Sequence, residues 1–145
     1  MNQIEILLLG IDPCGIRSPR TLAALQAKQL NLDFAVLEQE QLGGALRSFP
    51  RQKVVMTAPV DMPIYGKVQL RRTTKEALLE LWEEIVDKTE LAIEQGIKVG
   101  DIKRDGELFV IETSQGERRA RRVLLAVGRR GTPRKLGIPG EQRDK

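Results

Sequence analysis

Apolar and polar positions in the first forty residues alternate in a pattern that predicts a strand, a helix and a second strand. Residues 4–10 form a nearly continuous apolar run that ends on glycine, as expected of a central parallel strand covered on both faces. Ser18 and Pro19 favour a helix start, and residues 20–30 carry an apolar stripe at helical spacing. Residues 33–38 form a second buried run that ends in a carboxylate. This order predicts a right-handed βαβ unit.

The middle of the chain is less regular. Residues 41–70 are rich in glycine and proline and have no helical period, so we expect an irregular excursion over the sheet. Thr73 or Thr74 is the expected cap of a helix over 75–88, in which Trp82 falls among leucines and is predicted to be core. Residues 91–94 are predicted to form a third parallel strand.

Three alternating segments follow, and then a final apolar run. Turn dipeptides Asp105-Gly106 and Gln115-Gly116 separate these segments, which predicts antiparallel hairpins between residues 98 and 122. Residues 122–128 are predicted to be the last buried strand, and like the first it ends on glycine. The whole pattern predicts one α/β domain over residues 1–145: a Rossmann-like three-layer fold with a parallel sheet and an antiparallel β-hairpin insert.

Composition narrows the chemistry. One cysteine and no histidine among 145 residues exclude a disulfide framework, imidazole catalysis and a cysteine-built zinc site, so no metal site is predicted. A net charge of +4 favours anionic partners without the excess of a dedicated nucleic-acid binder. No apolar run reaches the ~20 residues of a membrane span, and the amino terminus lacks the pattern of a signal peptide. We therefore expect a cytoplasmic protein without a membrane partner.

The turn from Gly10 to Gly15 stands where a Rossmann-type domain places its G-x-G-x-x-G sequence. There, glycines let the backbone approach a pyrophosphate at a helix start. Asp12 replaces the second glycine, and its carboxylate would crowd and repel a diphosphate. Two interpretations remain open on this spacing: a dinucleotide site, or a strand-to-helix turn that binds nothing.

Charged residues flank this turn. Glu38 ends the second strand, where such domains place an acid that accepts hydrogen bonds from the ribose of an adenosine. The alternative is an exposed strand-end glutamate. Arg17 and Arg20 are interpreted as solvated at the helix start, although either could offset the charge of Asp12.

Longer stretches carry a resemblance to a known family. They are Leu42-Gly43-Gly44, Phe49-Pro50-Arg51, the hairpins from Gly96 to Arg122, the run from Val123 to Pro133 and Leu136-Gly137-Ile138-Pro139-Gly140. Together they resemble the N-terminal FAD-binding part of the two-dinucleotide-domain flavoproteins. Within that group they resemble thioredoxin-reductase-like enzymes, including the bacillithiol-disulfide-reductase type that lacks a CxxC pair. The likeness covers nearly the whole chain. Its most specific part is the strand that ends in Ala126-Val127-Gly128, together with Ile138-Pro139-Gly140 after it.

The resemblance implies FAD as cofactor and assigns no catalytic residue to this chain. In such enzymes a nicotinamide nucleotide reduces the flavin, which passes electrons to a disulfide or another acceptor, while the protein positions the ring. The resemblance implies that Gly10, Pro13 and Gly15 contact the pyrophosphate of FAD and that Glu38 holds the adenosine ribose. Gly43 and Gly44 would approach the flavin end, and Val99 would approach the adenine. Ala126, Val127 and Gly128 would contact the cofactor where it meets the chain a second time.

The departures from the family leave two functions open. Asp12 makes FAD binding uncertain, and the chain stops where such enzymes continue into an NADPH-binding domain. We expect a fragment or split subunit that is inactive alone, with a missing NADPH-binding domain or subunit as partner. Only the complete assembly would be an NAD(P)H-dependent flavin oxidoreductase. The alternative is a degenerate, cofactor-free Rossmann-like module that mediates protein interaction.

Cys14 and the arginine-rich residues 118–135 each allow a structural and a functional interpretation. Cys14 lies beside a helix start that would stabilise a thiolate, but it has no histidine base or second cysteine, which favours a packing role. The arginine-rich residues 118–135 are interpreted first as solvated and second as a contact for a missing domain or cofactor phosphates. Nucleic acid ranks last, because five aromatic residues offer little for base stacking.

Overall fold

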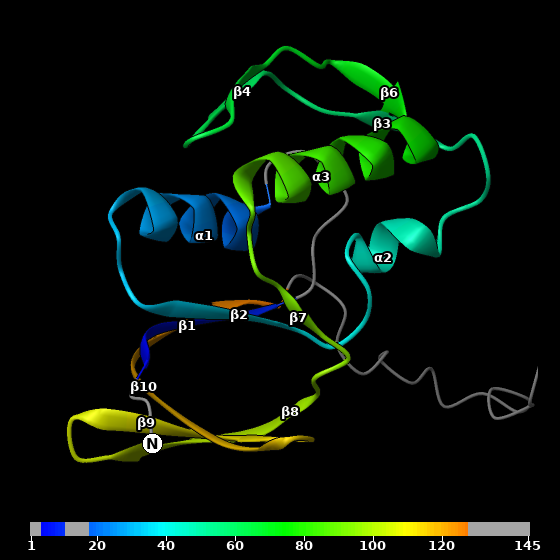
Figure 1. Cartoon of the computed structure of the whole chain (residues 1–145). Coiled ribbons are helices and arrows are strands. Elements are labelled where there is room, and N and C mark those ends of the chain that lie inside the picture. The colour runs from blue at the N-terminus through cyan, green and yellow to red at the C-terminus, as the bar shows by residue number, and fades with distance from the viewer. Residues whose placement is uncertain (1–3, 11–17, 128–145) are drawn as a thin grey trace, which may run out of the picture.

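The computed structural model describes residues 4–10 and 18–127 of the chain. Figure 1 shows helices over one face of a sheet, with a β-hairpin curling beneath the other face. The elements in chain order are β1 (Ile4–Gly10), α1 (Pro19–Gln29), β2 (Phe34–Glu38), α2 (Gly44–Arg47), β3 (Val54–Met56), β4 (Val60–Met62), β5 (Gly66–Val68), β6 (Arg72–Thr74), α3 (Lys75–Thr89), β7 (Glu94–Gln95), β8 (Val99–Asp105), β9 (Leu108–Thr113) and β10 (Gly116–Ala126).

The main sheet confirms the predicted α/β, Rossmann-like class. Its strand order over the described residues is β7-β2-β1-β10-β9-β8. The pairs β7-β2, β2-β1 and β1-β10 are parallel, whereas β10-β9 and β9-β8 are antiparallel. The parallel part repeats the 3-2-1-4 order of a dinucleotide-binding half, and the chain reverses direction across the sheet between β1 and β10. That reversal is the topological switch point.

Both predicted helix starts are present. The Ser18 hydroxyl accepts a hydrogen bond from the Thr21 amide at 3.3 Å, with Pro19 in the first turn of α1. The Thr74 hydroxyl accepts from the Ala77 amide at 3.3 Å at the start of α3. Trp82, in α3, is 1% exposed and lies in the core as expected.

Alternation along β1 divides the core between the two faces of the sheet. Leu8 joins the helix-side core, which includes Leu25 of α1 and Leu78, Trp82 and Ile85 of α3. Leu7 and Leu9 point the other way and pack with Leu37, Ile97, Ile111 and Ala120 on the hairpin side. Because both faces are covered, β1 is apolar at nearly every position, which is the pattern that identified it in the sequence.

Three expectations about individual elements were wrong. The third parallel strand is not residues 91–94 but the two-residue β7, which pairs with β2 through Leu37 and Glu38. The described parts of the expected hairpin segment 118–122 and of the expected strand 122–128 belong to one strand, β10, which pairs with β9 from Gly116 to Ala120 and with β1 from Ala120 to Ala126. The region 41–70 contains short elements, and β3, β4 and β6 lie over α3 rather than over the sheet (Figure 1).

The hairpins of the insert are present, with their turns displaced by one residue. β8 and β9 pair up to Asp105 and Leu108, so the connecting residues are Gly106 and Glu107. β9 and β10 pair up to Thr113 and Gly116. Gly106 and Gly116 have φ values of 62° and 109°, which explains why glycine marks each turn.

The backbones of β1 and β10 approach each other closely at the end of β1. Gly10 stands opposite Ala126 in the parallel register, and a Cβ at Gly10 would lie 2.3 Å from the Ala126 carbonyl oxygen. A backbone oxygen cannot move aside as a flexible side chain can. Glycine is therefore required here by contact between β1 and β10.

Gly10→Ala is expected to destabilise the fold strongly, because the added methyl group would push β10 away from β1. The control is Gly100→Ala on β8, where a Cβ would meet its nearest atom at 3.7 Å. We expect Gly10→Ala to cost about 2 kcal/mol or more in the free energy of unfolding and Gly100→Ala less than about 1 kcal/mol. Urea denaturation followed by Trp82 fluorescence measures both, and equal losses would contradict the explanation.

Candidate functional site

The carboxyl ends of β1, β2 and β10 meet at a cavity of about 250 Å³ on the hairpin side of the sheet. Parallel strands that reverse order at a switch point leave a crevice of this kind at their carboxyl ends. The start of β8 closes the far side of the cavity. Its lining residues are Leu9, Gly10, Leu37, Gln39, Ile97, Val99, Ile102, Leu125 and Val127.

This lining is predominantly apolar and partly open to solvent. Leu125 and Val127 are 60% and 51% exposed, although both belong to the end of β10 or follow it directly. Large apolar side chains exposed at the mouth of a cavity indicate a surface that is covered in the functional state. The lining residues that the structure describes carry no ionisable side chain, so the walls they form suit an uncharged group.

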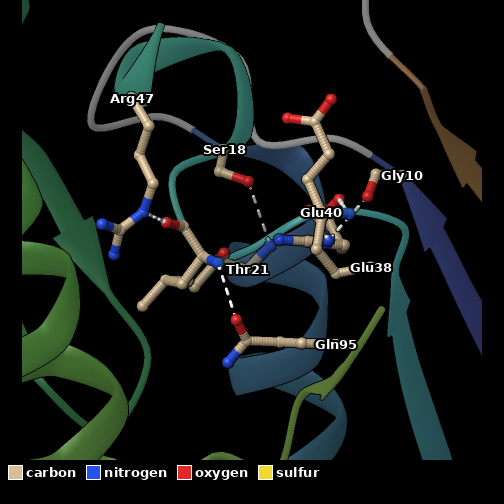
Figure 2. Close-up of polar contacts among 9 residues, drawn as sticks. Gly10, Ser18, Thr21, Glu38, Glu40, Arg47 and Gln95 are labelled. Carbon is tan, nitrogen blue, oxygen red and sulfur yellow. Dashed lines mark hydrogen bonds and ion pairs between the residues drawn. The ribbon is translucent and has the colours of Figure 1, made fainter. Parts of the chain in front are cut away.

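A buried ion pair lies on the helix side of the same strand ends. The Arg20 Nη1 atom donates to Glu38 Oε2 at 2.6 Å and to the Gly10 carbonyl oxygen at 2.6 Å. Both side chains are 0% exposed. The second carboxylate oxygen, Glu38 Oε1, accepts from the Glu40 amide at 3.0 Å. Figure 2 shows Gly10, Glu38 and Glu40 gathered at this point beside Thr21 of α1.

These contacts correct two interpretations made from the sequence. Arg20 is not solvated at the helix start, and Glu38 is not an exposed strand-end residue. The sequence carried a signal for this: Arg20 precedes the buried Ala24 and Ala27 by four and seven residues, so all three share one face of α1. A charge on the buried face of a helix requires a partner, and Glu38 supplies it.

Gly43 and Gly44 lie apart from the apolar cavity. Gly43 has φ +89°, and a Cβ there would lie 2.3 Å from Leu79 Cδ2, so its small size lets the chain pass close to α3. Gly44 begins α2 and lines a second hollow of about 590 Å³ with Gln39, Glu40, Gln41, Arg47, Gln95 and Gly96. Gln39 lines both hollows, which are therefore neighbours along the strand ends.

β7 is tied to the segment before α2. The Gln95 side-chain oxygen accepts a hydrogen bond from the Leu42 amide at 3.0 Å, and the Arg47 Nε atom donates to the Leu42 carbonyl at 2.6 Å (Figure 2). The second hollow is therefore framed by groups whose positions are set by hydrogen bonds. Its geometry depends on β7, which sequence periodicity misplaced.

The structure brings together only part of the predicted set. Gly10, Val99 and Val127 line the apolar cavity, and Ala126 stands opposite Gly10. Glu38 lies at the same strand ends but on the helix side. Leu9, Leu37, Gln39, Ile97, Ile102 and Leu125 also line the cavity and were missed as site residues, because only the tertiary arrangement selects them among similar apolar positions. Pro13, Gly15, Gly128, Asp12, Cys14 and Arg17 lie outside the described residues.

Three arginines of β10 each contact a carboxylate on the same strand or on another strand of the sheet. Arg118 contacts Glu94 at 2.8 Å, Arg119 contacts Glu117 at 2.9 Å and Arg122 contacts Glu5 at 3.3 Å. Carboxylates interleaved with the arginines weaken any attraction to a phosphate backbone. For the arginines of β10, these contacts favour the interpretation as solvated side chains over a contact with nucleic acid.

The resolved pKa shifts belong to other parts of the molecule. The hydrogen bond from Lys88 is the main reason why the pKa of Glu84 lies below its usual value, and one from Tyr65 adds to it. Burial is the main cause that raises the pKa of Tyr65.

In residues 4–10 and 18–127, no three acidic, histidine or cysteine side chains gather as a metal site would require. No helix within those ranges is both long and apolar enough to cross a bilayer.

A 3-2-1-4 parallel sheet with a glycine at the switch point and a crevice beyond it defines a Rossmann-like nucleotide-binding fold. The chain belongs to the pyridine nucleotide-disulphide oxidoreductase family, whose profile matches residues 8–145. Among its relatives, the thioredoxin reductase of Peptoclostridium acidaminophilum is 30% identical over 142 residues. The bacilliredoxin reductase Bdr of Bacillus subtilis is 25% identical over 150 residues.

Solved structures agree on the fold. The bacillithiol disulfide reductase Bdr of Bacillus cereus superimposes with a TM-score of 0.79 at 18% identity, over 97% of this chain and 44% of that one. The T. acidophilum thioredoxin reductase gives 0.63 at 22% identity, over 95% and 39%. The two sequence relatives are covered over 39% and 44% of their length, against 97% and 100% of this chain. The chain thus spans about two fifths of the proteins it matches.

Removing one partner of the buried ion pair is expected to destabilise the fold far more than removing both charges. Arg20→Met leaves Glu38 charged and buried, which should cost about 3–5 kcal/mol in the free energy of unfolding. In Arg20→Met/Glu38→Gln the glutamine still accepts from the Glu40 amide, so most of this loss should be recovered. Denaturation curves of the wild type, both single variants and the double variant measure the coupling. Additive losses would show that the two side chains do not depend on each other.

Proposed function

We propose that this chain is the FAD-binding portion of a thioredoxin-reductase-like oxidoreductase. The observation that carries the proposal is the apolar cavity at the joined ends of β1, β2 and β10, with Gly10, Val99 and Val127 in its lining. Membership of the family and the likeness of fold to disulfide reductases support it. Three of the residues expected from the sequence line this cavity, and two of them, Gly10 and Val127, lie more than a hundred residues apart in the chain.

The shape of the cavity fits one end of the cofactor. A volume of about 250 Å³ lies below the roughly 300–1,000 Å³ of complete small-molecule sites. Its apolar walls suit the adenine ring, to which the family resemblance assigns Val99. The second hollow at Gly44 would then take the part of the cofactor that leads toward the flavin. FAD, when bound, would supply the two-electron chemistry, and this chain would hold and orient it.

The rest of the reaction would depend on other protein. We infer that a nicotinamide nucleotide is bound by a further domain or subunit, since relatives extend well beyond the region this chain matches. The exposed apolar side chains at the cavity mouth, Leu125 and Val127, would be covered by the cofactor. An NAD(P)H-dependent activity of the assembled protein is part of the proposal.

A second candidate function has its own observation in favour. The Glu38 carboxylate, which should receive a ribose, is fully buried and engaged by Arg20 and the Glu40 amide. A chain whose ribose-binding acid is already paired can be a cofactor-free Rossmann-like module that serves protein contacts. The two candidates differ in one measurable property, the affinity for FAD.

The purified chain is expected to bind FAD, and Val99→Glu should weaken that binding. A carboxylate in the apolar wall would be poorly solvated and would repel the diphosphate, so we expect a loss of about tenfold or more. Met56→Glu is the matched control, because Met56 is 73% exposed on β3 and the charge change is the same. Quenching of flavin fluorescence on titration measures the affinity. No binding by the wild type would favour the cofactor-free function.

Asp12→Gly tests the altered turn independently. If the carboxylate repels the cofactor diphosphate, restoring glycine should tighten FAD binding by about tenfold, the effect of one unfavourable charge near an anion. The control is Asp12→Asn, which removes the charge and keeps the bulk. Equal affinity in the wild type and both variants would refute a role of Asp12 in cofactor discrimination.

A further inference from the structure

The Arg20 guanidinium joins three elements that meet at the predicted ribose position. It starts from the first turn of α1, reaches the Gly10 carbonyl oxygen at the end of β1 and the Glu38 carboxylate at the end of β2. The Arg20 and Glu38 side chains are both 0% exposed. These are the three elements of the βαβ unit whose crevice receives the adenosine half of a dinucleotide.

A ribose and the guanidinium make competing demands on Glu38. Both are hydrogen-bond donors to the same carboxylate, and a ribose diol must reach its oxygens directly. The Glu38 side chain is 0% exposed, with Arg20 on Oε2 and the Glu40 amide on Oε1, so a ribose reaches the carboxylate only if a neighbouring group moves. Arg20 is the side chain that donates to this carboxylate, and displacing it would free Oε2 for a ribose hydroxyl.

We propose that Arg20 is an internal competitor for the ribose of the nucleotide at Glu38, and so sets the affinity and selectivity of the site. The inference rests on the proposed nucleotide-binding function. The closed pair stabilises the nucleotide-free chain. A nucleotide whose ribose displaces Arg20 gains contact with Glu38 at the cost of the Arg20–Glu38 hydrogen bond, whereas a ligand that does not reach Glu38 leaves the pair intact.

The change in nucleotide affinity when Arg20 is removed shows whether Arg20 competes with the ribose or orients Glu38 for it. If Arg20 merely oriented Glu38 for the ribose, its loss would weaken binding. If it competes, its loss leaves an unpaired carboxylate in the free protein, and the ribose hydroxyls become the donors that satisfy it. Only competition predicts a tighter complex after removal of a buried arginine.

The test uses ADP, which carries the ribose and diphosphate without the flavin, titrated calorimetrically into the full chain and its variants. Arg20→Met is expected to bind ADP more tightly than the wild type by tenfold to a hundredfold, on the order of the effect of one hydrogen bond to a charged group. In Arg20→Met/Glu38→Gln the gain should be lost, because the carboxylate is absent. Arg122→Gln removes the same charge from an exposed pair with Glu5 and should leave the affinity unchanged.

The outcomes separate the two proposals. Tighter binding that depends on Glu38 supports competition, even where the wild type itself binds too weakly to measure. Unchanged or weaker binding by Arg20→Met, with a wild type that binds, overturns competition and leaves the nucleotide site in place. No binding by the wild type and by Arg20→Met overturns both.

A measurement on the unaltered chain covers the case in which Arg20→Met does not fold. In NMR spectra of ¹⁵N-arginine-labelled protein, the buried Arg20 guanidinium should exchange slowly with water, and saturation with ADP should abolish that protection. A guanidinium that stays protected in the saturated complex would overturn the proposal. Spectra that do not respond to ADP at any concentration would overturn it together with the nucleotide site.

Discussion

The contact between the backbones of β1 and β10 at Gly10 and Ala126 determines where every other part of the site can lie. With no side chain between them, the two strands run parallel and in register until their ends, so residues separated by more than a hundred positions share one crevice. β2 joins on the other side of β1 through the α1 crossover. The cavity is the space that these three strand ends and the start of β8 leave unfilled.

The two faces of the sheet give this crevice two different characters. On the hairpin side the lining is apolar, because Leu9 and Leu37 continue the core that β8 and β9 cover. On the helix side, the last residue of β2 is Glu38, which faces α1 and is neutralised by Arg20. A nucleotide would need both sides, an apolar wall for its base and an acceptor for its ribose. In this structure the apolar wall is accessible to a ligand, whereas the Glu38 carboxylate is buried.

The buried ion pair links stability to binding. A buried ion pair depends on further hydrogen bonds to its polar atoms, and here the carboxylate has a donor on each oxygen while the guanidinium also reaches the end of β1. These contacts occupy the carboxylate that a ligand would use. The ion pair thereby ties together β1, α1 and β2.

Local sequence determined the elements whose signals are short-range. The apolar runs of β1 and β2, the Ser18 and Thr74 caps and the glycine turns were predicted from the residues themselves, because period, capping and positive φ act within a few positions. The tertiary structure alone decided that β7 replaces residues 91–94, that β10 is one strand pairing on both sides, and that Arg20 meets Glu38. Each of these depends on contacts between segments that are distant in the chain. Local sequence does not specify which distant segment a residue will meet, so the partners are determined only when the chain folds.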